Sequence, residues 1–258
     1  MKERLLFLFF LIFSLTTSVK AEVWQANQVW SEYWENEYQR WVNKNLTTQI
    51  FKDGKTILTG LPTDCADALY AIRILFSYEH SLPFVINAPE VLSSQMKTFG
   101  NDTSMFDSIS DEKKRVRAFI NYIGDEVGAY NLQKDTFPVK IKEINSGIIY
   151  IVEWQLLGMG KYNQHSYMIK GFDPDHELIY YYSDAPRKVR TLEVNVKYPR
   201  FEFGYAPYGY RRWKWPSHLL IPENQIPSEA GYSREQYELV ARVGKKQILK
   251  EIRDILRN

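Results

Sequence analysis

The stretch PTDCADALYAIRILFSYEH, residues 62–80, carries the strongest helix signal in the chain. Either Thr63 or Asp64 can cap the N-terminus of a helix, and a proline stands just ahead of this pair. The apolar run that follows has helical length, and a second proline three residues beyond its end stops it. The pattern predicts a buried helix from about Cys65 to His80 whose first turn carries a thiol.

Cys65 is the only cysteine in the sequence. A lone cysteine cannot form an internal disulfide, so in an oxidising compartment it is either buried and inert or used as a thiolate. A thiol in the first turn of a helix lies near the positive end of the helix dipole, which lowers its pKa. Asp64 and Asp67 act in the opposite direction by like charge, so a neighbouring imidazole is needed to form an ion pair.

Residues 1–21 have the three parts of a secretory signal peptide. Lys2 and Arg4 give a positive start, Leu5–Leu15 is an apolar run, and residues 19–21 offer a cleavage site. The run is about 11 residues long, whereas a helix that spans a bilayer needs about 20, so we expect cleavage rather than an anchor. No cysteine lies near the cleavage point, which excludes a lipoprotein anchor. A bacterial-type exported protein is expected, periplasmic or secreted, with no stable membrane insertion after cleavage.

The mature chain, residues 22–258, has the length of a single secreted domain. The signal holds Lys2, Arg4, Lys20 and Glu3, so 33 basic and 31 acidic residues become thirty of each. This balance does not indicate a nucleic-acid partner. No metal site and no cofactor is indicated either. We expect an aromatic helix region over 22–59, a core over 60–218 and a C-terminal helix over 219–258.

Helices are expected on both sides of a strand-rich region. An apolar stripe at three- and four-residue steps favours core packing of the first helix over a binding role for its rings. This stripe consists of Trp30, Trp34, Tyr38 and Trp41. Residues 87–112 are polar and turn-rich, and another helix is expected from Ser110 or Asp111 to about Gly128. Ser233 and Gln236 have the spacing of a capping box for the last helix.

From Val139 the pattern changes to that of strands. Four strands are expected, over Ile148–Trp154, Ser166–Phe172, Leu178–Tyr182 and Val189–Val196. Residues 198–218 are rich in Tyr, Trp, Arg, Pro and Gly, a composition typical of a long ordered loop. Helices followed by hairpin-connected strands indicate an α+β fold in which the Cys65 helix packs on an antiparallel sheet.

Among the four histidines, His165 is the best candidate to pair with Cys65. His80 lies about 22 Å from the thiol along the helix, at 1.5 Å per residue. His176 is expected in a turn and His218 in the aromatic loop. His165 begins a strand directly after the polar stretch 158–164, and the exposed end of a strand holds a base rigidly.

The hairpin after His165 supplies a third polar group. A two-residue turn at 174–175 places His165 opposite Asp184, and cross-strand partners have side chains about 5 Å apart on one face. A carboxylate there can fix the imidazole tautomer and stabilise its cation. A turn one residue longer or shorter places Ser183 opposite His165 or shifts the pair. Alternatively, Asp184 only caps the turn before Pro186.

Together these residues resemble the NlpC/P60 cysteine peptidases over about residues 60–185. Asp64-Cys65 opens an apolar helix, a Ser146-Gly147 turn enters a buried strand, and His165 leads the next strand. The resemblance implies a papain-like fold with Cys65 as nucleophile, His165 as general base and then acid, and Asp184 as the orienting group. It also implies a peptide bridge of peptidoglycan as substrate. The backbone amide of Cys65 is a natural oxyanion donor.

The sequence departs from that family in three places. Ala66-Asp67 stands where small residues usually follow Asp-Cys, and the Pro-Gly-Asp turn of the family is degenerate at Ser146-Gly147. An insertion over 87–135 lengthens the gap between Cys65 and His165. A divergent relative is therefore expected.

Residues 187–214 combine eight Lys and Arg residues with only two Glu residues, interleaved with aromatic rings. Such side chains suit anionic polymers and sugar or peptide rings, and outside the cytoplasmic membrane that polymer is cell wall. We therefore expect substrate to bind Arg211, Arg212, Trp213 and Trp215. The alternative is that the rings pack over the sheet while the arginines extend to solvent.

The predicted function is that of a secreted thiol peptidase or amidase which cleaves amide bonds, in peptidoglycan stem peptides. Two alternatives remain open at this point. One is a non-catalytic cell-envelope binding module on the same fold, which a buried Cys65 or a distant His165 favours. The other is a transglutaminase-like acyl transferase.

Overall fold

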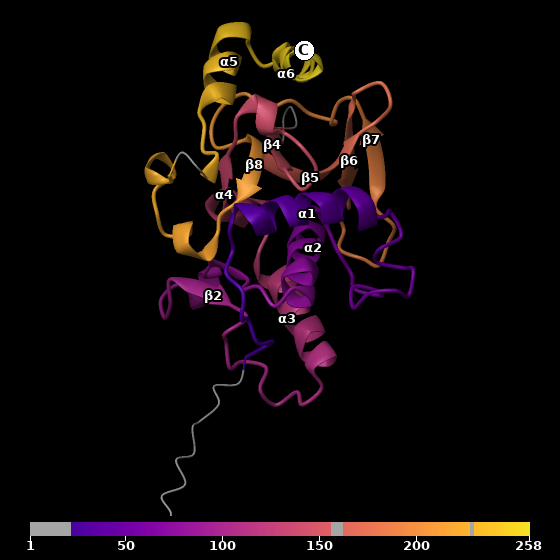
Figure 1. Ribbon diagram of the computed structural model, residues 1–258, viewed down its shortest axis with the longest axis vertical. Helices are drawn as coiled ribbons and strands as arrows, with labels where there is room; N and C mark the ends of the chain where they lie inside the picture. The colour runs from indigo at the N-terminus through magenta and orange to yellow at the C-terminus, as the bar shows by residue number, and fades with distance from the viewer. Residues whose placement is uncertain (1–21, 156–161, 228–229) are drawn as a thin grey trace, which may run out of the picture.

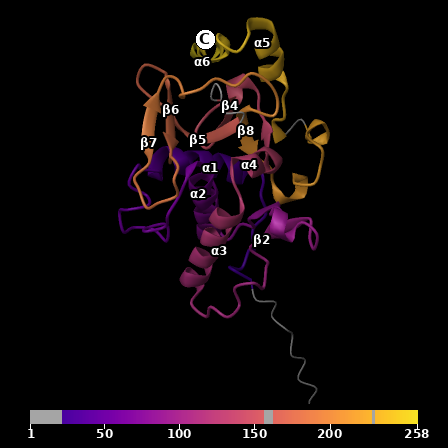
Figure 2. The same cartoon turned by 180° about the vertical axis from the view of Figure 1, so that it is seen from behind.

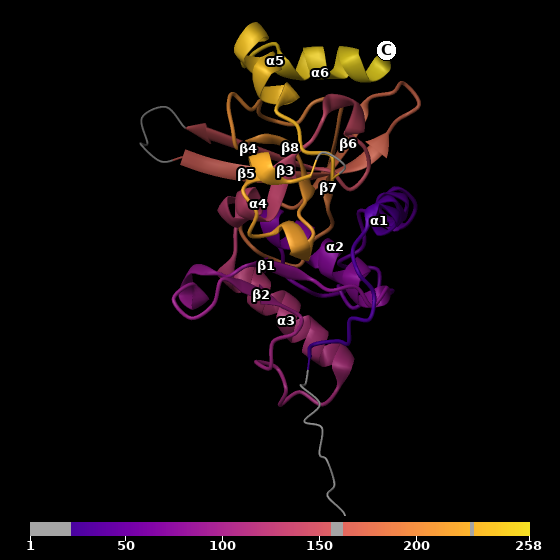
Figure 3. The same cartoon turned by 60° about the vertical axis from the view of Figure 1, so that its left-hand side comes forward.

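An antiparallel sheet of six strands separates two groups of helices in the computed structural model, which describes residues 22–155, 162–227 and 230–258 (Figures 1 and 3). The predicted signal peptide and residues 158–161 lie outside these ranges. The strands are β3 (Thr136–Pro138), β4 (Ile149–Gln155), β5 (Tyr162–Phe172), β6 (Leu178–Tyr182), β7 (Glu193–Val196) and β8 (Gly209–Trp213). They lie in the order β3-β8-β4-β5-β6-β7. Figure 2 shows β7 beside β6 at one edge of the sheet.

The helices lie on both sides of this sheet. They are α1 (Glu32–Asn45), α2 (Cys65–Glu79), α3 (Glu112–Glu126), α4 (Ala129–Asp135), α5 (Glu235–Val243) and α6 (Ile248–Arg257). Figure 3 shows α5 and α6 above the sheet, with α1 and α2 on its other side and α3 beyond α2. The fold class is α+β with an antiparallel sheet, as the order of helical and strand patterns predicted.

Helix α2 begins where the sequence predicted, with Asp64 as its N-cap. The Asp64 carboxylate accepts hydrogen bonds from the amides of Ala66 and Asp67, and the Asp67 carboxylate accepts one from the amide of Asp64. This reciprocal arrangement satisfies amides that have no partner inside the helix. All residues from Ala66 to Ser77 are buried, so α2 forms the centre of the core.

The aromatic stripe packs in the core, as predicted. Four rings surround Phe76 of α2 at centroid separations between 5.2 and 6.5 Å. They belong to Trp30, Trp34, Tyr38 and Trp41. Beneath them a buried ion pair joins Arg73 to Glu35 at 2.8 Å, with the guanidinium 3.6 Å above the Trp30 ring. These contacts fix α1 against α2.

The β5–β6 hairpin reaches the predicted register by a different route. Its turn has three residues instead of two, because the amide of Asp173 donates to the carbonyl of Glu177, and His176 adopts φ of 58°. This turn alone displaces the pairing by one residue. A bulge between Ile169 and Gly171 displaces it back, so that Met168 pairs with Tyr181. The predicted turn is wrong, and the predicted facing of the strands beyond the bulge is right.

Two other segments differ from the prediction. Residues 198–218 are not a continuous loop, because β8 lies in the middle of the sheet between β3 and β4. Residues 87–112 contain part of a second, two-stranded sheet, β1 (Val85–Asn87) with β2 (Thr98–Gly100), where Phe99 packs on Phe119 of α3.

The C-terminal helical run also differs from the prediction. It is divided into α5 and α6 at Gly244, which has φ of 80°. The predicted capping box does not form, because the Gln236 amide is buried and donates to the backbone carbonyls of Val139 and Tyr210. The side chain that would have closed the box joins α5 to the sheet instead.

Candidate active site

Cys65 is the first residue of α2, and its half-buried thiol lies against β5. The polar groups of Ser166, in the side chain and the backbone, lie near the thiol and favour the thiolate. Burial outweighs them and, together with the charge of Asp64, raises the pKa of the thiol to about 11. The helix start therefore does not produce a resting thiolate, and Cys65 is a neutral thiol near pH 7.

His165 lies in β5, where it pairs with Val152 of β4. The residue is 6% exposed, and its ring contacts Tyr167 at 4.6 Å and Tyr182 at 5.4 Å between centroids. Burial lowers the pKa of the imidazole to about 4, against the charges of Asp184 and Asp64, while Arg200 acts in the same direction as burial. The imidazole is therefore also neutral near pH 7.

Asp184 lies beside His165, as the hairpin arithmetic predicted. Its Oδ1 atom is 3.6 Å from Nε2 of the imidazole, and its side chain is 40% exposed. This separation exceeds that of a normal hydrogen bond, and Nε2 has no hydrogen-bond partner among the described residues. Because Asp184 stands at Nε2, the other ring nitrogen, Nδ1, is the one left to exchange a proton with a nucleophile.

The thiol of Cys65 and the imidazole of His165 lie on opposite faces of β5. Side chains of successive strand residues point to opposite faces, so Ser166 points toward α2 and His165 points toward the tyrosines of the other face. The paired strand β6 ends at Tyr182, which leaves the thiol at the edge of β5 beside the backbone of Ser166. The two predicted partners therefore lie on opposite faces of one strand and do not form a preformed ion pair.

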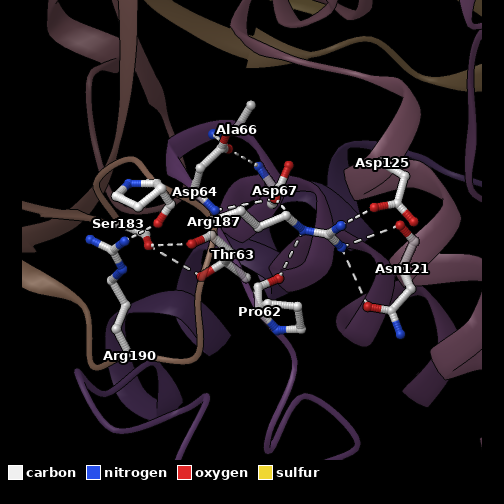
Figure 4. A network of polar contacts seen from close by, with 11 residues as sticks. Pro62, Thr63, Asp64, Ala66, Asp67, Asn121, Asp125, Ser183, Arg187 and Arg190 are labelled. Atoms are coloured by element: carbon white, nitrogen blue, oxygen red, sulfur yellow. Dashed lines mark hydrogen bonds and ion pairs between the residues drawn. The ribbon is translucent and has the colours of Figure 1, made fainter.

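Arg187 joins the site to its surroundings, a role that the sequence did not reveal. Its Nε atom lies 2.9 Å from Oδ2 of Asp67, and the guanidinium also contacts the carboxylate of Asp125 on α3 (Figure 4). Burial and the charge of Asp64 raise the pKa of Asp67 to about 7, against the effect of Arg187. In the sequence, Arg187 is only one of several cations in the basic segment 187–214, and nothing there indicates its partners.

The predicted substrate-binding residues do not form a surface. Arg211 is fully buried and donates to the carbonyls of Thr136 and Gln133 at 2.8 and 3.0 Å. Arg212 is 5% exposed and bonds to Glu32 at 2.7 Å. This part of the prediction is wrong because β8 is a central strand, so its side chains fill the interior.

The two tryptophans of that group have packing contacts as well. Trp213 is 3% exposed and lies 5.2 Å from the Tyr70 ring of α2. Trp215 is half-buried and stacks on His218 at 5.2 Å. The alternative prediction, that the rings pack on the sheet, is correct for Trp213. Its second part is wrong, because Arg211 and Arg212 are buried instead of extending to solvent.

Neither a metal centre nor a membrane span accompanies this site in the part of the chain that the structure describes. No group of three or more His, Cys, Asp or Glu side chains there could hold a metal ion. No helix among those residues is long and apolar enough to cross a membrane. Comparison with protein-family models, curated proteins and solved structures found no match to this chain.

Proposed function

We propose that this chain is a cysteine hydrolase of papain-like, NlpC/P60-like type that cleaves amide bonds. Cys65 is the nucleophile, His165 the general base and then acid, and Asp184 the group that orients the imidazole. The observation that carries the proposal is the position of Asp184, 3.6 Å from Nε2 of the histidine that neighbours the thiol-contacting Ser166. Asp184 and His165 therefore lie side by side where β6 ends, and Cys65 lies beside Ser166, the next residue of β5.

The reaction starts from a neutral pair, because the pKa of the thiol is about 11 and that of the imidazole about 4. Because the two groups lie on opposite faces of β5, the proton of the thiol has to reach Nδ1 of His165 around the edge of the strand, through an intervening water, as the Cys65 sulfur attacks the carbonyl carbon. Asp184 beside Nε2 stabilises the imidazolium that forms. The Asp64 cap uses the amides of Ala66 and Asp67, which leaves the Cys65 amide to donate to the oxyanion.

The second half of the reaction regenerates the thiol. The imidazolium gives its proton to the amide nitrogen, the C–N bond breaks, and an amine leaves a thioester on Cys65. His165 then takes a proton from water, whose oxygen attacks the thioester, and the sulfur departs with that proton as the acid product forms. An amine in place of water gives acyl transfer, so the same residues also serve a transglutaminase-like reaction.

The substrate class rests on the resemblance and on the predicted export signal. Peptidoglycan stem peptides offer amide bonds in the compartment that a signal peptide over residues 1–21 implies. The buried positions of Arg211 and Arg212 remove the argument from a basic surface. Cell-wall peptide therefore remains the proposed substrate without a wall-binding patch on β8.

A non-catalytic envelope-binding module is the second candidate. It is favoured by the 6% exposure of His165 and by the raised pKa of Cys65, since both groups are then neutral and packed like ordinary core residues. Such a protein keeps the fold and lacks turnover.

Incubation of the mature protein with purified peptidoglycan separates the two candidates. We expect soluble peptide fragments, identified by mass spectrometry, from the wild-type protein and none from Cys65→Ser at equal thermal stability. His165→Ala should lose release in the same way. Binding to the insoluble polymer without release of fragments, identical in wild type and Cys65→Ser, supports the binding module instead. An added amine acceptor that appears in the fragments shows acyl transfer.

A further inference from the structure

Arg187 contacts two separate segments of the chain (Figure 4). Its Nε atom lies 2.9 Å from Oδ2 of Asp67 and donates to the carbonyl of Pro62 at 3.3 Å. Nη1 bonds to Asp125, and Nη2 donates to the carbonyl of Asn121 at 3.3 Å. One side chain that follows Asp184 by three residues therefore reaches the first turn of α2 and the last turns of α3.

The segment 183–188 is also tied to Thr63 on both sides of Asp184. Before it, the Ser183 hydroxyl donates to the Thr63 carbonyl at 3.1 Å. After it, the amide of Thr63 donates to Lys188 at 3.1 Å and that of Lys188 donates back at 3.3 Å. Asp184 thus sits in a short loop held at both ends against the residues that lead into Cys65.

The geometry requires the fork of an arginine. Three nitrogen atoms each meet a different partner, which a single ammonium group cannot reproduce. Asp67 is only 4% exposed and Arg187 is 25% exposed, so the contact lies largely out of solvent. Its interaction free energy is therefore larger than that of an ordinary surface ion pair.

Gly124 lets α3 approach this contact. A Cβ atom at that position would lie 2.8 Å from Nη2 of Arg187 and 3.2 Å from Cγ of Asp67. A residue with a side chain therefore forces the guanidinium or the carboxylate to move. The absence of a side chain at Gly124 is part of the same arrangement.

We propose that Arg187 is a positioning residue that holds Asp184 beside His165 by tying the segment 183–188 to α2 and α3. Its importance for turnover rests on the proposed function, whereas its effect on the Asp184–His165 pair does not. Asp184 is 40% exposed and has no hydrogen bond to Nε2, so its own contact with the ring is too weak to hold the loop. We call the contacts of Arg187 with α2 and α3 the clamp. The clamp holds the loop that carries Asp184, between the two ends that Thr63 fixes.

The test is a double-mutant comparison on the His165 ring. The imidazole nitrogen and proton resonances of ¹⁵N-labelled mature protein are recorded at about pH 7.5 for wild type, Asp184→Ala, Arg187→Met and the double variant. Removal of the carboxylate shifts the Nε2 resonance. Arg187→Met should reproduce that shift in direction and size, and the double variant should add nothing, since both changes remove the same contact. Lys188→Met, an exposed cation one residue further on, is the control and should leave the resonances in place.

Gly124→Ala keeps the test open if Arg187→Met does not fold. It removes no charged group and raises helix propensity, yet it displaces the clamp. We expect a smaller shift of the Nε2 resonance in the same direction, and none for Gly128→Ala, where nothing lies within 4 Å of the added carbon. Wild-type His165 resonances in folded Arg187→Met or Gly124→Ala, with a shift in Asp184→Ala, would overturn the proposal.

The alkylation rate of Cys65 by iodoacetamide distinguishes failure of the clamp from failure of the proposed function. If both hold, Arg187→Met loses the same part of the rate near pH 7 as Asp184→Ala. If the ring resonances move as expected but the rate is the same in wild type, His165→Ala and Arg187→Met, the clamp stands and the catalytic pairing falls. Additive ring shifts in the double variant would show that Arg187 acts elsewhere.

Discussion

His165 and Arg211 are both polar residues buried in the sheet, and they differ in how their polar atoms are satisfied. Arg211 is fully buried, and its three guanidinium nitrogens all donate within the protein, to Thr136, Pro207 and Gln133 among others. His165 is 6% exposed, and its Nε2 has no hydrogen-bond partner among the described residues. Oδ1 of Asp184 lies 3.6 Å from this nitrogen. Buried polar groups are normally satisfied, so the exception needs an explanation. Other buried atoms among the described residues also lack a partner, such as Oγ of Ser166 and Nε1 of Trp213, so what sets His165 apart is a titratable imidazole nitrogen beside a carboxylate, and this makes it the candidate for chemistry.

The largest effect is expected from Asp184→Asn, which tests the unsatisfied side of this comparison. The variant keeps the shape of the side chain but loses the charge that stabilises the imidazolium, so kcat on peptidoglycan peptides should fall by about 10²- to 10⁴-fold. The melting temperature should stay near that of the wild type, because the carboxylate is 40% exposed. Rates and melting curves of the same preparations provide the measurement.

Asp175→Asn serves as the matched control for this change. Asp175 lies exposed in the turn of the same hairpin, so its carboxylate should not affect turnover. Equal rates for Asp184→Asn and wild type would remove the orienting role and place His165 among the structural groups.

Arg211→Met tests the satisfied side. It removes a buried cation that joins β8 to Thr136 and to the carboxylate of Glu223, so carbonyls and a carboxylate lose their partner. We expect a loss of about 3–5 kcal/mol in the free energy of unfolding, measured by chemical denaturation. Arg200→Met, a change at an exposed cation of the same segment, should cost within about 0.5 kcal/mol. Equal stability of Arg211→Met and wild type would reopen a binding role for this residue.

The hairpin shows how sequence reasoning can reach a correct contact through compensating errors. A two-residue turn predicted His165 opposite Asp184, yet the turn has three residues and a bulge before Gly171 restores the pairing. Turn length depends on His176 adopting φ of 58°, which composition does not specify. The capped start of α2 was predictable, because Asp64 and its two amides are neighbours in sequence.

Strand β8 shows what local patterns miss. Its sequence Gly-Tyr-Arg-Arg-Trp has the composition of a loop, because arginine is rarely buried. The partners that make burial possible, Thr136 and Glu32, are 75 and 180 residues away in the chain. The role of Arg187 is hidden in the sequence for the same reason, since its partner Asp67 belongs to the start of a distant helix. The sequence shows which residues are polar, but whether their buried polar atoms find hydrogen-bond partners depends on tertiary contacts.

The smallest expected effect is on stability and concerns Asp67. This residue is buried and paired, like the satisfied groups, but its raised pKa lets it titrate. Its pKa is raised from 3.8 to about 7, so the folded protein binds this proton more tightly than the unfolded chain. The contribution of Asp67 to the free energy of unfolding should therefore be largest below about pH 4 and decline as the pH rises to about 7. Asp67→Asn should flatten this decline in denaturation curves taken at several pH values. A wild-type slope in the variant would mean that Arg187 keeps Asp67 ionised throughout.

The pH dependence of Cys65 alkylation by iodoacetamide tests most directly whether Cys65 works with His165. Rates are measured from about pH 6 to about pH 10 in the folded mature protein and in His165→Ala. Because the thiol has a pKa of about 11 and needs a base to react below it, the wild type should be faster than the variant near pH 7. The two curves should converge as the pH approaches the pKa of the thiol. Curves that coincide over the whole range would show that Cys65 reacts without His165 and would contradict the proposed catalytic pair.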